Sequence, residues 1–335
     1  MQKQLLGLII VGVILVSLFV ESSLRSVQAA KSKRIALIYD VGGRGDLSFC
    51  DASYAGAKKA VDQWELEFRD FTPGQSTDIE LALRQFARLK YDLIIGVGFL
   101  FQEPMNRVAA EFPDVNFAIV DVEAEGHNVA SLIFKAHEGT YLVGAIAALK
   151  TQTNKIGFIG GMNIPLLHRF EAGYHAGATA IHPEIEVFVD YAGVTPQAFS
   201  DPAKGKEIAL AQYNKGVDVI IAAAGATSLG ILEAAKEKKK YLIWVDANGN
   251  HLAPGLVLTS MIKGVELSIY QTIQSVVAGN FTGGTKVYGL KEGGIEYIVD
   301  DNNRKLLSAE ILNRVEVIKR EIISGEIVVP FETGK

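Results

Sequence analysis

From Lys33 onward, the chain alternates short apolar, β-branched runs with longer amphipathic segments. The first two segments with helical spacing are Asp51–Trp64 and Asp78–Leu89. Strands that alternate with helices are typical of βαβ units and a parallel sheet. The first group of predicted strands comprises Arg34–Tyr39, Leu66–Phe71, Tyr91–Val97 and Asn116–Val122.

The same alternation starts again further along the chain. Its strands are Lys155–Ile159, Glu186–Tyr191, Val217–Ala222 and Tyr241–Val245, and its helices are Leu167–Ile181, Pro202–Asn214 and Leu229–Lys238. Two similar sheets predict an α/β protein of two lobes with a hinge between them. We expect residues 33–135 with 257–283 to form the first lobe, and residues 136–256 with 284–335 to form the second.

The amino terminus has the order of a secretory signal. Lys3 precedes the apolar run Leu5–Val20, which a polar stretch and then Ala29 and Ala30 follow. Residues 1–30 are therefore a cleaved signal peptide or an uncleaved membrane anchor, because a spanning helix needs about 20 apolar residues. Both readings place the remaining chain outside the cytoplasm, at the cell surface or in a periplasm. A lipid anchor is disfavoured, since the only cysteine, Cys50, lies far beyond the apolar run.

Composition narrows the class of partner. At 335 residues and 49% hydrophobic content, the chain has enough apolar side chains for two cores. The net charge of −5, with lysines and arginines scattered, provides no basic stripe for a phosphate backbone. Nucleic acid is therefore not an expected partner.

The first candidate site follows the first strand. Ligands of open parallel sheets bind beyond the carboxyl ends of the strands, and here the stretch from Asp40 to Phe49 contains Asp46 and three glycines. The glycines allow a ligand to approach the backbone closely. A dinucleotide is disfavoured, because the third glycine of GxGxxG is absent and two acidic residues would repel a pyrophosphate.

Other strand ends repeat the acidic pattern. Asp121 and Asp246 each follow an apolar strand. A carboxylate accepts two hydrogen bonds, which suits a ribose diol or the N–H edge of a purine. The alternative is that each aspartate caps the helix that follows it.

Aromatic rings would complete a nucleoside site by stacking on the base. The candidates are Phe49, Phe170 and Phe199, each of which could instead be a core residue. Lys263 could donate to ligand hydroxyls, or it could be a solvated lysine. These patterns favour a small polar ligand, either a nucleoside or another solute such as a sugar.

Catalytic and cofactor motifs are missing from the sequence. It contains no GxSxG, P-loop or HExxH motif, and its six histidines lack the spacing of metal ligands. We therefore expect a binding protein without cofactor or metal, not an enzyme. An exported nucleoside-processing enzyme and a ligand sensor are the alternatives.

Several segments resemble the basic membrane protein family of solute-binding proteins, which includes the purine nucleoside receptor A proteins. The segments lie in the family's order, and they are residues 40–43 with 46–49, residues 158–162 with 169–173, residues 201–207, Val245-Asp246 and residues 260–263. The resemblance implies a type I periplasmic-binding fold, the permease subunits of an ABC importer as partner, and a purine nucleoside as ligand.

The resemblance also implies roles for single residues. Asp40, Phe49 and Asp121 would serve from the first lobe and Phe170 or Phe199 from the second, while Asp246 and Lys263 would bind ribose near the hinge. The sequence departs from the family's usual Asn-Asp-Lys-Ser-Phe-Asn form, because Gly45, Leu47 and Cys50 replace Asn, Lys and Asn. The loss of these polar groups bears on which solute is bound.

Overall fold

The structure is a computed structural model that describes residues 32–332. The predicted signal peptide or anchor, residues 1–30, lies outside the described residues. All helices and strands described below belong to one compact unit, Arg34–Lys335. Within the described range, no helix combines the length and the hydropathy needed to cross a bilayer.

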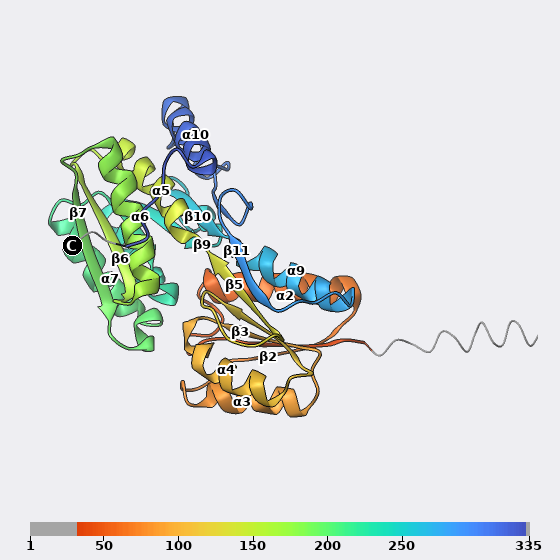
Figure 1. Ribbon diagram of the computed structural model, residues 1–335. Coiled ribbons are helices and arrows are strands. Elements are labelled where there is room, and N and C mark those ends of the chain that lie inside the picture. Colours follow the sequence, from red (N-terminus) through yellow and green to blue (C-terminus); the bar gives the residue numbers. More distant parts are fainter. Residues whose placement is uncertain (1–31, 333–335) are drawn as a thin grey trace, which may run out of the picture. The chain divides into compact units, whose positions relative to one another are not determined.

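Two six-stranded sheets organise the chain, as the repeated alternation predicts (Figure 1). The first sheet has the order β11-β5-β4-β3-β1-β2, and all of its strands are parallel. Its strands are β1 (Arg34–Ile38), β2 (Glu67–Phe71), β3 (Leu93–Val97), β4 (Asn116–Val120), β5 (Val129–Phe134) and β11 (Gly284–Tyr288).

The second sheet has the order β12-β10-β9-β8-β6-β7, and only β12 runs antiparallel to its neighbour. Its strands are β6 (Lys155–Met162), β7 (Glu186–Gly193), β8 (Val219–Ala223), β9 (Tyr241–Asp246), β10 (Val257–Lys263) and β12 (Ile295–Tyr297). The expected α/β class with two parallel-dominated sheets is confirmed.

Helices cover both faces of each sheet, which explains the continuous apolar runs of the strands. The first lobe contains α2 (Phe49–Trp64), α3 (Asp78–Arg88), α4 (Gln102–Glu111) and α9 (Val265–Val277). The second lobe contains α5 (Ala136–Lys150), α6 (Pro165–Ile181), α7 (Pro202–Asn214), α8 (Ser228–Lys238) and α10 (Ala309–Ser324). Four short 3-10 helices, η1 (Phe99–Phe101), η2 (Pro196–Phe199), η3 (Gly225–Thr227) and η4 (Asn250–Leu252), lie in the loops.

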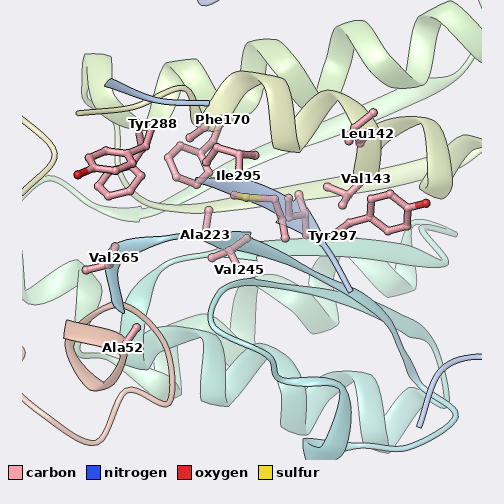
Figure 2. Packing of buried hydrophobic residues seen from close by; sticks show 14 of the residues in the cluster. Ala52, Leu142, Val143, Phe170, Ala223, Val245, Val265, Tyr288, Ile295 and Tyr297 are labelled. Atoms are coloured by element: carbon pink, nitrogen blue, oxygen red, sulfur yellow. The ribbon is translucent and has the colours of Figure 1, made fainter. Parts of the chain in front are cut away.

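One hydrophobic cluster continues from one lobe into the other. It joins strand residues of both sheets with α2, α5, α6 and α9. Figure 2 shows some of its members, among them Ala52 of the first lobe and Phe170 and Val245 of the second. The outer face of each sheet has a separate cluster, against α3 and α4 in the first lobe and against α7 and α8 in the second. The inner cluster therefore ties the two lobes together.

Two strands lie in a different sheet from the one expected. We expected residues 257–283 in the first lobe, but β10 pairs with β9 and β12 in the second sheet, and only α9 packs on α2. We expected residues 284–335 in the second lobe, but β11 pairs with β5 in the first sheet. The chain thus passes between the lobes three times, after β5, after β10 and after β11.

Candidate functional site

One cavity lies at the carboxyl ends of strands from both sheets. It encloses about 670 Å³ of empty space, the part open to solvent included. All eight residues predicted from the sequence line it, namely Asp40, Asp46, Phe49, Asp121, Phe170, Phe199, Asp246 and Lys263.

Two acidic residues occupy equivalent places in the two sheets. Asp121 follows β4 and Asp246 ends β9, and each of these strands is third in its sheet, counted from β11 or β12. Their φ angles are 79° and 69°. A left-handed backbone at a residue other than glycine is strained, and such strain gathers at functional sites. The two turns therefore aim a carboxylate from each lobe into the cavity.

Lys263 joins these two carboxylates across the lobes. It ends β10, and its Nζ donates to Asp121 Oδ2 at 2.8 Å and lies 3.4 Å from Asp246 Oδ1. Its side chain is only 4% exposed. Burial lowers the pKa of Lys263, but the two carboxylates raise that pKa by more, so the net shift is upward. Lys263 is therefore a buried ammonium ion, and the alternative of a solvated lysine is wrong.

Asp40 presents a carboxylate with one oxygen bound by the protein. Its Oδ1 accepts from the backbone N–H of Gly42 at 3.0 Å and lies 3.6 Å from the thiol of Cys50. A Cβ atom at Gly98 would lie 3.6 Å from Asp40 Oδ2. Burial raises the pKa of the Asp40 carboxyl. The missing side chain at Gly98 leaves space for a ligand beside the second oxygen.

Asp46 lines the cavity, but its carboxylate is engaged by the start of α2. It accepts hydrogen bonds from the backbone N–H groups of Ser48 at 3.0 Å, Cys50 at 2.8 Å and Asp51 at 3.1 Å. Free N–H groups at a helix start are satisfied in this way by acidic side chains. Burial raises the pKa of Asp46 to about 6, against the effect of these hydrogen bonds. Its interactions in the structure are those of a capping residue.

The predicted aromatic residues come from three different elements. Phe49 begins α2, Phe170 lies within α6 and is 5% exposed, and Phe199 ends η2. A Cβ atom at Gly161 would lie 2.2 Å from Cε1 of Phe199, so the Phe199 ring rests directly on the backbone of β6. This contact explains why residue 161 is a glycine.

Sequence reasoning missed Phe99, which also lines the cavity. It follows β3 and Gly98, whose φ is 105°. A glycine and an aromatic residue directly after an apolar strand were the signal available in the sequence. The first lobe therefore supplies two rings, Phe49 and Phe99.

The loop after β1 also contacts the second lobe. Ser48 Oγ donates to the carbonyl of Val245 at 3.0 Å and to Asp246 Oδ2 at 3.2 Å. The indole N–H of Trp244 donates to the carbonyl of Leu47 at 3.1 Å. These hydrogen bonds hold the end of β9 against the start of α2.

The side chains of the cavity offer a solute both polar and apolar contacts. Carboxylates and an ammonium group accept and donate hydrogen bonds to hydroxyl and N–H groups, and the rings cover apolar or aromatic faces. Among residues 32–332, no group of three or more His, Cys, Asp or Glu side chains is placed to hold a metal ion. The arrangement suits an organic solute with both polar and flat parts.

Comparisons with known proteins agree with this geometry. The family model described as "ABC transporter substrate-binding protein PnrA-like" matches residues 7–333. The CD4+ T-cell-stimulating antigen of Listeria monocytogenes is 34% identical, over 90% of this chain and 89% of that protein. The ABC transporter nucleoside-binding protein BmpA of Lactococcus lactis is also 34% identical, over 89% of each chain.

Solved structures of other proteins are similar to this chain over most of its length. The solute-binding protein of an ABC transporter system from Aeropyrum pernix K1 superposes with a TM-score of 0.83 at 32% identity, covering 90% of this chain and 94% of that one. An ABC transporter solute-binding protein from Conexibacter woesei gives a TM-score of 0.71 at 25% identity. The family match and these similarities show that the chain belongs to the Bmp family of PnrA-like ABC transporter substrate-binding proteins.

Proposed function

We propose that this substrate-binding protein captures a nucleoside, of the purine class, in the cavity between its lobes and delivers it to the permease of an ABC importer. The observation that carries the proposal is the convergence of carboxylates and aromatic rings from both sheets on one cavity. The name of the Lactococcus lactis relative, a nucleoside-binding protein, supports the same ligand class.

The polar groups of the cavity suggest how the ligand lies. Asp121, Asp246 and Lys263 form one group, and ribose hydroxyls can both donate to the carboxylates and accept from the ammonium. Asp40 lies beside Gly98, where its second oxygen can accept from an N–H group of the base. The ribose would thus point towards the hinge strand β10, and the base would point towards Gly98.

Capture would follow from closure of the lobes on the ligand. A ligand held by both sheets gains contacts in the closed state that it lacks in the open one, and this difference shifts the equilibrium towards closure. The importer would then recognise the closed form. Such a role requires a location outside the cytoplasm, with the segment 1–30 as signal or membrane anchor.

A ligand panel tests the proposal. We expect inosine, guanosine or adenosine to raise the melting temperature of residues 32–335, and ribose, arabinose and galactose to have little effect. At a ligand concentration about 100-fold above Kd, binding stabilises the folded state by about 2.7 kcal/mol. Calorimetric titration then supplies Kd, and chromatography of the titrated sample shows whether the nucleoside is intact, as we expect of a binding protein. A response to sugars alone, or to none of these compounds, would overturn the nucleoside assignment.

A further inference from the structure

The two carboxylate oxygens of Asp246 have different surroundings. Its Oδ2 accepts from the hydroxyl of Ser48 in the first lobe at 3.2 Å, and its Oδ1 lies 3.4 Å from Lys263 Nζ. Of the described residues, none forms a hydrogen bond with Oδ1, which is buried. The protein therefore engages one oxygen of Asp246, and the other can accept from a hydroxyl of a ligand in the cavity that Asp246 lines.

The hydroxyl of Ser48 is available for this contact because another residue caps α2. Ser48 is the N-cap residue of that helix, and a serine there ordinarily accepts from a backbone N–H group of the first turn. The carboxylate of Asp46 accepts from the N–H groups of Cys50 and Asp51 instead. In the described chain, the Ser48 side chain makes no capping hydrogen bond. Its hydroxyl is therefore left to donate to the second lobe.

The surroundings of Ser48 fix its side chain in place. Ser48 is 1% exposed, and its Oγ lies 3.0 Å from the carbonyl oxygen of Val245, so one proton is shared between that carbonyl and Asp246. Next to it, the indole N–H of Trp244 donates to the carbonyl of Leu47. Ser48 is not one of the described residues that line the cavity. An effect of Ser48 on a ligand must therefore act through another residue.

We propose that Ser48 is a positioning residue that orients Asp246 for the sugar hydroxyls of the ligand. The inference rests on the proposed function and deepens it. Rotation of an aspartate carboxylate about χ2 is broad, so the ion pair with Lys263 does not by itself fix its orientation. The hydrogen bond from Ser48 holds Oδ2, which keeps Oδ1 available to the ligand. Because Ser48 and Asp246 belong to different lobes, this orientation is complete only when the lobes are together.

The variant Ser48→Ala tests the assignment with two ligands. Kd for inosine and for 2′,3′-dideoxyinosine, which lacks both ribose ring hydroxyls, is measured by calorimetric titration of the chain 32–335. The matching guanosine or adenosine pair is used where that nucleoside binds more tightly. We expect Ser48→Ala to raise Kd for the nucleoside roughly tenfold, equivalent to about 1.4 kcal/mol, the size of one hydrogen bond. Kd for the dideoxy analogue should change by less than about twofold, because it has no ring hydroxyl to donate to Asp246.

Ser53→Ala is the matched control. Ser53 lies further along α2, is 0% exposed, and its hydroxyl donates to the carbonyl of Phe49 within the same helix at 2.8 Å. This variant should leave both Kd values unchanged, and melting curves check the fold of each variant. If Ser48→Ala weakens both ligands equally, or weakens neither, the positioning role is refuted while the proposed function stands. If the wild type binds no purine nucleoside, both fail.

Discussion

Replacing Lys263 by methionine removes the buried charge and keeps most of the side-chain length. The side chains of Asp121 and Asp246 are 5% and 9% exposed, so without the ammonium they would be buried carboxylates that have lost the cation in contact with them. Removing one partner of a buried ion pair lowers the free energy of unfolding by about 3–5 kcal/mol. We expect a loss of this size for Lys263→Met at pH 7.

The measurement is urea unfolding of the variant and the wild type. Their midpoints are compared at an equal slope of free energy against urea concentration. Burial raises the pKa of Asp121 even while Lys263 opposes the shift. In the variant, the pKa of Asp121 in the folded state therefore lies above its unfolded-state value of about 3.9. Below the unfolded-state pKa of about 3.9, Asp121 is protonated in both states and does not destabilise the variant. The destabilisation grows as the pH rises through the pKa that Asp121 has in the folded variant. We expect the difference between variant and wild type to shrink from pH 7 towards pH 4.

Lys59 provides a matched control on the surface. Its side chain is 62% exposed and its Nζ lies 3.7 Å from Glu266, so Lys59→Met should cost less than about 1 kcal/mol. The double variant Lys263→Met with Asp121→Asn should recover part of the loss, because it removes one of the two unpaired charges. The reasoning fails if Lys263→Met is no more destabilising than Lys59→Met, or if its effect does not depend on pH.

Two further predictions concern the start of α2 and the floor of the cavity. Because burial raises the pKa of Asp46 to about 6, its contribution to stability is present below about pH 3.9 and is lost as the pH rises through 6. We therefore expect the urea midpoint of Asp46→Asn to vary less with pH in this range than that of the wild type. An equal variation in both proteins would contradict the raised pKa of Asp46. Gly161→Ala would place a methyl group 2.2 Å from the Phe199 ring, so we expect roughly tenfold weaker nucleoside binding and about 1–3 kcal/mol lower stability. Gly74→Ala, whose Cβ would lie 3.5 Å from its nearest neighbour, is the control, and equal affinities of the two variants would contradict the prediction.

Much of the fold follows from local pattern, but the exchange of strands between lobes does not. Strands that helices cover on both faces form apolar runs, which is why both sheets could be predicted. The helix α5 (Ala136–Lys150) was missed because it is buried on nearly every side and has no polar face to reveal a helical period. The strand β10 pairs with β9, which directly precedes it in the chain, whereas β11 pairs with the distant β5, and neither run of residues encodes that choice locally.

The site was more predictable than the exchange of strands, for a topological reason. The carboxyl ends of parallel strands share one edge of a sheet, so acidic residues after successive strands must come together. Sequence alone could not tell that backbone N–H groups engage Asp46, because this depends on how the loop after β1 turns. Nor did it single out Phe99 among 16 phenylalanines, since its position depends on the left-handed turn at Gly98.

The placement of Lys263 links the charge balance of the cavity to the distance between the lobes. Lys263 and Asp246 belong to the second sheet, whereas Asp121 belongs to the first, so the ammonium reaches both carboxylates only when the lobes are together. A ligand hydroxyl that enters this group can donate to a carboxylate and accept from the ammonium at once, which keeps every buried charge hydrogen-bonded. A phosphate in the same place would add negative charge beside two carboxylates. The arrangement therefore favours an uncharged sugar over a phosphorylated one, independently of which base the rings hold.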